Sequence, residues 1–260
     1  RVLGKCGGSL SDIADAIRWA AGGAVDGVPV NTTPAHVISL SLGVGQACPA
    51  TMQSAVDAAI AAGAVVVAAT GNEGLTIPSA PSNCSGVISV TAHTINGENS
   101  TYANIGSKGG TDPRPSISAP GGGPPIMLGS GGPTDDEDWF GYYIWSTVLF
   151  GNTTPNSGGG PGGTSTGPAY VGAIGTSAAT PQVAAVAALV KSLLPNASSA
   201  QVLSFVVSNS RPHPDGGACA AGGGLVGQCG PGLLDANAAV RAAALVAAPT
   251  DGGAAPPTGG

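Results

Sequence analysis

Short apolar runs alternate with amphipathic stretches through the first half of the chain. The apolar runs have strand length and lie at residues 37–42, 64–69, 87–91 and 116–119. Helical spacing of apolar residues is found from Ser9 or Ser11 to Ala20 and from Pro49 to Gly63. Strands and helices that alternate in this way are typical of βαβ units, whose strands are parallel. We therefore expect an α/β fold of three layers, with a mostly parallel β-sheet flanked by helices.

The regular pattern stops at residues 121–167, which are rich in glycine and proline and hold an acidic run at 135–138. A loop of this length without secondary structure is unusual in a compact domain. We expect one strand inside it, at 144–150, with long loops on both sides. The acidic run is most simply a solvated loop, and a calcium site is the alternative.

Helical spacing returns near the C-terminus. The predicted helices lie at 177–194, at 199–208 and from an Asp235 cap to about Ala247. Residues 248–260 are rich in proline and glycine and show no periodicity, which is typical of a linker or tail. The expected organisation is thus one domain at 1–247, with a glycine-rich insertion at about 121–167, followed by the tail.

Composition narrows the range of partners. Charged residues make up only 8% of the chain, with 8 Lys and Arg against 14 Asp and Glu. Nucleic-acid binding needs clustered Lys and Arg to neutralise phosphates, so it is not expected. No apolar run reaches the roughly 18 residues of a membrane span, so no membrane partner is expected either.

The five cysteines are scattered, without the paired spacing of a zinc site. Two disulfides and one unpaired cysteine fit better, and disulfides indicate an oxidising, extracellular compartment. We expect the pairs Cys48–Cys84 and Cys219–Cys229. Cys6 would then remain, with a partner upstream of Arg1 as the simplest explanation.

Two short segments carry candidate chemistry. Ser177 lies between a glycine-rich loop and a long apolar helix, where free N–H groups favour nearby negative charge. A plain N-cap is the alternative role for this serine. Asn72 follows the buried run at 64–69, at the carboxyl end of a predicted strand where α/β proteins bind ligands. Its amide can donate to a developing oxyanion, and an ordinary turn asparagine is the alternative.

Taken together, the segments resemble motifs of the subtilase family of serine proteases in their order along the chain, their residues and their separation. Residues 175–181 (GTSAATP) are similar to the family's nucleophile motif, which begins G-T-S-M-A, and residues 65–74 (VVVAATGNEG) to its V-V-V-A-A-A-G-N-E-G strand and turn. Residues 39–43 (SLSLG) resemble its substrate-binding segment, and 1–4 (RVLG) the strand after its catalytic histidine helix. The resemblance covers about residues 1–246 and implies a subtilisin-like fold with its N-terminal part missing.

The resemblance also implies roles for individual residues. Ser177 would be the nucleophile, and the Asn72 side chain and the Ser177 backbone N–H would form the oxyanion hole. The substrate-binding residues would be Ser41, Leu42 and Gly43 along the cleft, Ala68, Ala69 and Gly71 around the pocket for the residue before the scissile bond, and Thr176. Small residues in that pocket favour large apolar substrate side chains.

The family's D-[ST]-G and H-G-T-H segments do not occur in this sequence. None of the three histidines, His36, His93 and His213, lies in such a segment. Each is expected to be a surface residue or to have a structural role. In the family's order the catalytic Asp and His precede the strand matched by residues 1–4. We therefore expect both upstream of Arg1, and expect this chain alone, as the C-terminal two-thirds of the domain, to be inactive and poorly stable.

The function implied is that of a secreted, monomeric serine endopeptidase, which hydrolyses peptide bonds through an acyl-enzyme on Ser177. Its partners would be protein or peptide substrates and the missing N-terminal segment of its own domain. The alternative is a non-catalytic homologue that binds peptides in the same cleft. Ala178, Gln182 and Ala185 stand where the family has Met, His and Gly, which fits either case. The family often binds calcium, but no metal ligand and no other cofactor can be named here.

Overall fold

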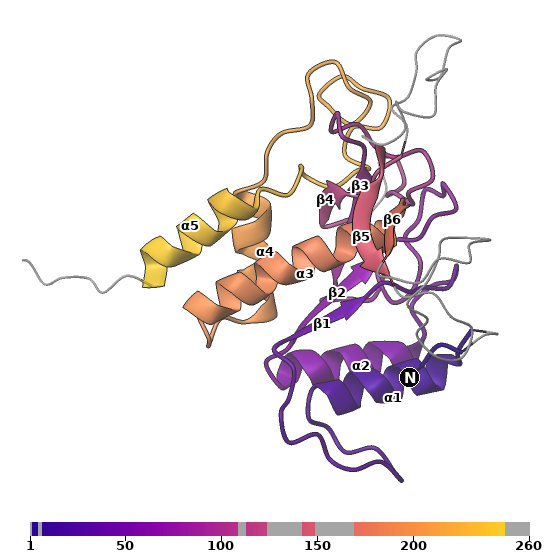
Figure 1. Ribbon diagram of the computed structural model, residues 1–260, viewed down its shortest axis with the longest axis vertical. Coiled ribbons are helices and arrows are strands. Elements are labelled where there is room, and N and C mark those ends of the chain that lie inside the picture. The colour runs from indigo at the N-terminus through magenta and orange to yellow at the C-terminus, as the bar shows by residue number, and fades with distance from the viewer. Residues whose placement is uncertain (1, 5–6, 109–112, 124–141, 149–168, 248–260) are drawn as a thin grey trace, which may run out of the picture.

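The computed structural model describes residues 2–4, 7–108, 113–123, 142–148 and 169–247 (Figure 1). Several expectations concern residues outside these ranges: Arg1, the unpaired Cys6, the acidic run at 135–138, most of the 121–167 insertion and the tail at 248–260. The elements, in chain order, are α1 (Leu10–Ala20), β1 (Val37–Leu40), α2 (Ala50–Ala61), β2 (Val65–Ala69), β3 (Ile88–His93), β4 (Ile117–Pro120), β5 (Ile144–Val148), β6 (Ala169–Ala173), α3 (Thr176–Leu193), α4 (Ser199–Ser208) and α5 (Ala236–Ala247).

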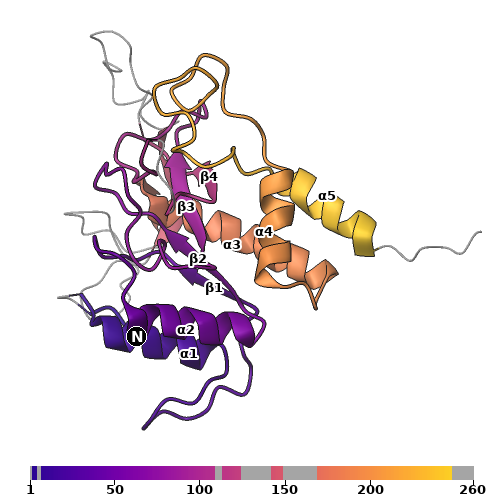
Figure 2. The ribbon, with the colours of Figure 1, turned by 180° about the vertical axis from the view of Figure 1, so that it is seen from behind.

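Strands β1 to β4 form one parallel sheet in the order β1-β2-β3-β4, and β5 and β6 form a separate antiparallel pair. Helices α1 and α2 cover one face of the parallel sheet, and α3, α4 and α5 lie on the other (Figures 1 and 2). The expected three-layer α/β fold is confirmed.

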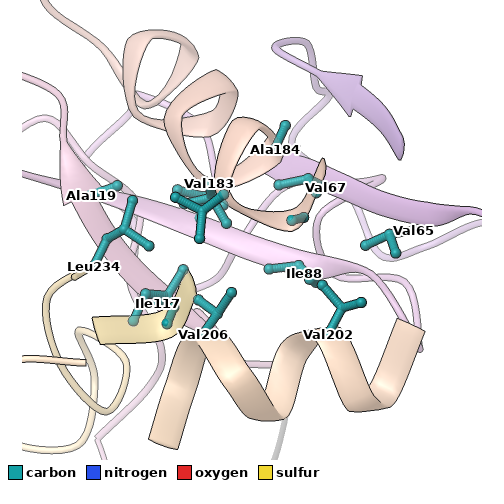
Figure 3. Packing of buried hydrophobic residues seen from close by; sticks show 14 of the residues in the cluster. Val65, Val67, Ile88, Ile117, Ala119, Val183, Ala184, Val202, Val206 and Leu234 are labelled. Carbon is teal, nitrogen blue, oxygen red and sulfur yellow. The ribbon is translucent and has the colours of Figure 1, made fainter. Parts of the chain in front are cut away.

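The central strands are apolar throughout because both faces of the sheet are covered. All five residues of β2 are buried. Val66 packs in the cluster on the α1 and α2 side, whereas Val65 and Val67 pack with α3 and α4 (Figure 3). The alternation of side chains along one strand therefore joins the two outer layers through the sheet.

Local capping fixes where the first helix begins. Of the two candidate caps, Ser9 is the one used, and its side-chain oxygen accepts a hydrogen bond from Asp12 N at 3.1 Å. The helix ends at Ala20, just before Gly22, whose φ of 87° is a conformation that favours glycine.

Three details differ from the sequence-based expectation. Residues 2–4 form no strand; a single bridge links Gly4 to Gly7, and no described strand runs beside them. β1 ends at Leu40 instead of Leu42, since Ser41 leaves the sheet to contact α3. β6 was not expected, and it forms because Val171 and its neighbours pair with β5.

The two outer edges of the parallel sheet differ. Beyond β4, Ser118 is bridged to Leu233, and Leu234 N donates to Ser118 O at 2.8 Å. A segment close to the C-terminus therefore covers that edge. β1 forms the opposite edge, and no other described strand pairs with its outer side.

Both predicted disulfides are present. Cys48–Cys84 joins the start of α2 to the loop before β3, and Cys219–Cys229 closes a short loop. Within the described ranges, none of the helices is both long enough and apolar enough to cross a membrane.

Candidate active site

The carboxyl ends of β1 and β2 meet the start of helix α3. Ser177 is the second residue of α3, and its side chain is exposed. Ser41, directly after β1, donates its hydroxyl hydrogen to Ser177 O at 2.8 Å, and Ser177 Oγ lies 3.5 Å from Ser41 O. The end of β1 therefore borders the candidate nucleophile, although these residues are far apart in sequence.

Asn72 lies on the other side of this site, in the turn after β2. Its Oδ1 accepts hydrogen bonds from Thr176 N at 2.8 Å and from Thr176 Oγ1 at 2.9 Å. These bonds fix which half of the amide faces α3. The donor half, Nδ2, makes no hydrogen bond to any residue in the described ranges, so both of its hydrogens are available to a ligand.

Gly175 marks the space between the two candidate oxyanion donors. Its φ of 148° is rarely adopted by residues with side chains. A Cβ at this position would lie 3.6 Å from Asn72 Nδ2 and 3.6 Å from Ser177 N. Both N–H groups therefore border the same small space, where they can donate to one oxygen atom.

The predicted cleft residues adjoin Ser177. Ser41 and Gly43 are exposed and Leu42 is half-buried. Gly43 approaches the next loop closely, since a Cβ on it would lie 3.2 Å from Ala80 O. This segment offers exposed backbone beside the nucleophile.

The predicted pocket residues of β2 are less accessible. Ala68 has no exposed surface and packs in the core on the α1 and α2 side, and Ala69 is only 3% exposed. Gly71 is half-buried and its N–H donates to Thr176 Oγ1 at 3.3 Å, where Thr176 itself is fully buried. Gly71 and Thr176 thus lie directly at the site, and Ala68 lies behind it.

The histidines lie away from Ser177 Oγ and none is hydrogen-bonded to it. His36 is exposed and precedes β1, at the opposite end of that strand from Ser41. His93 is buried at the end of β3, and its Nδ1 lies 3.1 Å from Ser118 Oγ. Desolvation by burial, followed by the positive charges of Arg211 and His213, lowers the pKa of His93 to about 4. His93 is therefore neutral at physiological pH.

Two residues that the sequence did not single out hold this region together. Asn104 is fully buried and hydrogen-bonds the turn after β2. The hydroxyl of Tyr102 accepts from Gly175 N at 2.9 Å, two residues before Ser177. Their partners are distant in sequence, so no local pattern in the sequence identifies them.

No metal site is apparent in the part of the chain that the structure describes. There, no three His, Cys, Asp or Glu side chains lie close enough together to hold an ion. The described residues therefore do not supply a carboxylate site for the calcium that the family resemblance implies.

Comparisons with known proteins show which family this chain resembles. The profile of the subtilase family matches residues 1–232. An extracellular protease of Xanthomonas campestris pv. campestris is 42% identical over 94% of this chain, and an extracellular basic protease of Dichelobacter nodosus is 36% identical over 93%. The chain spans 35% and 34% of the lengths of these two relatives.

Solved structures give the same result. A protease structure from Pseudoalteromonas arctica superposes with a TM-score of 0.74 at 38% identity, covering 94% of this chain and 61% of the other. Sequence and fold thus agree over nearly the whole chain. The chain belongs to the subtilase family.

Proposed function

We propose that this chain carries the nucleophile and oxyanion hole of a secreted serine endopeptidase. The observation that carries the proposal is the fixed amide of Asn72. Its Oδ1 is held by Thr176, and its Nδ2 borders the same space as the backbone N–H of Ser177. If Ser177 were only an N-cap and Asn72 only a turn residue, their N–H groups would not need to border a shared space.

In the proposed reaction, Ser177 Oγ attacks the carbonyl carbon of a peptide bond. The carbonyl oxygen becomes an oxyanion that accepts hydrogen bonds from Asn72 Nδ2 and Ser177 N. The C–N bond then breaks, the amine leaves with a proton, and an acyl-enzyme remains on Ser177. Water hydrolyses this ester and restores the serine.

The proton of Ser177 needs a general base. No described histidine is hydrogen-bonded to Ser177 Oγ, and His93 is engaged by Ser118. We place the base, a histidine oriented by an aspartate, in a part of the protein upstream of Arg1. The 260 residues alone would then show negligible peptidase activity, because an unassisted hydroxyl is a poor nucleophile at neutral pH.

The substrate would be a protein or peptide in extended form. The half-buried Leu42 and the exposed Gly43 support this part of the proposal, because they follow Ser41, which contacts Ser177, and their backbone can pair with a substrate strand. Ala69 and Gly71 would border the pocket for the side chain before the scissile bond. Ala68 would shape it from behind. Secretion is supported by the two disulfides and by relatives named extracellular proteases, and we expect a monomer.

The test compares the complete product of the gene with the 260-residue chain, each with a Ser177→Ala counterpart. We expect the complete product to hydrolyse casein and the Ser177→Ala form to be inactive. A complete product that binds peptides tightly but cleaves none, with or without Ser177, would instead identify a non-catalytic peptide-binding homologue.

A further inference from the structure

Asn104 is a fully buried side chain whose hydrogen bonds are concentrated on the turn after β2. Its amide nitrogen donates to Thr70 O at 3.0 Å, Glu73 Oε2 at 2.7 Å and Ser79 Oγ at 3.3 Å. Its carbonyl oxygen accepts from Glu73 N at 3.2 Å and Leu75 N at 2.8 Å. The Asn104 side chain therefore hydrogen-bonds residues on both sides of the turn. Burying its polar amide costs little free energy only while all of these partners stay in place.

These bonds enclose the position of Asn72. They reach Thr70 before it and Glu73 after it, and Asn104 N also donates to Gly71 O at 3.0 Å. The turn packs so closely that a Cβ on Gly71 would collide with Asn104 Nδ2. The backbone that aims the Asn72 side chain is thus held on both sides by Asn104.

Tyr102, two residues earlier, makes the equivalent attachment to α3. Its hydroxyl accepts from Gly175 N at 2.9 Å and donates to Gly121 O at 2.7 Å. Gly175 is the N-cap of α3, and its N–H is shared between the Tyr102 hydroxyl and Gly121 O, so Tyr102 helps to fix where the helix begins and where Ser177 N points. Burial of the ring raises the pKa of Tyr102, and its hydroxyl keeps its proton through the neutral range.

We propose that Asn104 and Tyr102 are positioning residues that together set the separation of the two oxyanion-hole donors, Asn72 Nδ2 and Ser177 N. The two residues lie on one short segment, and each is hydrogen-bonded to one half of the site. The inference rests on the proposed function. Its physical basis is that preorganised donors stabilise an oxyanion only when they stand at hydrogen-bond distance from it.

The expected kinetic signature is a selective loss of kcat. In the complete gene product, Asn104→Ala should lower kcat about 30-fold and Tyr102→Phe about 5-fold, with KM within about twofold of the parent value, because the hole acts on the transition state and not on bound substrate. Affinity for a peptide boronic acid, which forms a tetrahedral adduct with serine, should fall with kcat. Affinity for the product peptide should not change.

Matched variants separate positioning from folding. Asn99→Ala removes another buried asparagine, whose Nδ2 reaches the adjacent Ser100 O, and Tyr170→Phe removes a hydroxyl that is exposed. Both should leave kcat unchanged. If Asn104→Ala does not fold, the exposed Glu73 provides a second route. Glu73→Ala should lower kcat about threefold, and Glu73→Gln, which keeps an acceptor oxygen, should restore it.

Three outcomes are decisive. If Ser177→Ala and Asn72→Ala abolish or strongly reduce turnover while the Asn104, Tyr102 and Glu73 variants match the parent, the positioning role is overturned and the proposed function stands. If Ser177→Ala retains full activity, the proposed function itself fails. A rise in KM at constant kcat would likewise overturn the inference, since that pattern reports substrate binding.

Discussion

The start of helix α3 and the turn that follows the helix satisfy their backbone groups differently. At the N-terminal end, the N–H of Ser177 borders an open space beside Asn72 Nδ2. At the C-terminal end, the buried Lys191 donates from Nζ to Pro195 O at 2.7 Å and to Ala197 O at 3.0 Å. A groove of about 570 Å³ lies beside this second end, and most of its lining is apolar.

The difference shows which end of the helix is built for packing and which for a ligand. Buried helix termini are normally satisfied by side chains or water. Lys191 satisfies two carbonyl groups of the turn after the helix from within the protein, whereas the donors at Ser177 and Asn72 are left for another molecule. The comparison therefore predicts that changes at the first end affect activity and that changes at the second end affect stability alone.

The largest effect is expected from the nucleophile. Ser177→Ala in the complete gene product should lower kcat by about 10⁶-fold, the scale of removing a triad nucleophile. Ser192→Ala, at the other end of the same helix, removes only a hydroxyl that bonds to Leu189 O and should leave kcat unchanged. Initial-rate assays with a chromogenic peptide measure both. Equal loss in the two variants would remove the distinction between the helix ends.

The oxyanion donor comes next. Asn72→Ala should lower kcat about 10²- to 10³-fold with little change in KM, as expected for the loss of one donor to the transition state. Asn196→Ala, an exposed asparagine after the C-terminal end of α3, is the matched control and should have no effect. A normal kcat for Asn72→Ala would mean that its amide does not contact the reacting oxygen.

Acid should reveal a third difference, between the buried His93 at the end of β3 and the exposed His36 before β1. The pKa of His93 is lowered from 6.5 to about 4, so the unfolded chain binds this proton more readily than the folded chain. Stability is full above pH 6.5 and falls as the pH drops, by roughly 3 kcal/mol at pH 4. Urea titrations should show a flatter pH profile for His93→Gln than for His36→Gln. Identical slopes would exclude this source of acid sensitivity.

The smallest effect is expected at the packed end of α3. Lys191→Met leaves Pro195 O and Ala197 O without their donor and should lower the free energy of unfolding by about 2 kcal/mol. Turnover of the folded fraction should equal that of the parent. Thermal melts and active-site titration measure the two quantities separately, and a lower kcat per folded molecule would contradict the comparison.

Much of this fold could be predicted from local patterns. Val65 to Ala69 is an unbroken apolar run because both faces of the sheet are covered, and the structure confirms it as a strand. β6 was missed for a physical reason. Its sequence, AYVGA, is short and includes Gly172, and the strand exists only because it pairs with β5, which is distant in sequence.

The residues of the candidate site also differ in whether the sequence could predict them. Ser177 and Asn72 could be selected from the sequence because each stands in a distinctive motif at the start of a helix or the end of a strand. Asn104 and Tyr102 could not, since their hydrogen bonds reach Leu75 and Gly175 across 29 and 73 residues. A contact of that range leaves no periodic trace in the sequence.

The two outer edges of the sheet differ in whether a further strand could be added there. Beyond β4 the bridge to Leu233 occupies the place of a further strand, whereas beyond β1 no described strand does. Two copies that associate edge to edge would therefore meet along β1, next to Ser41 and within reach of the nucleophile. Any strand added to this sheet would therefore lie beside Ser41 and the proposed nucleophile.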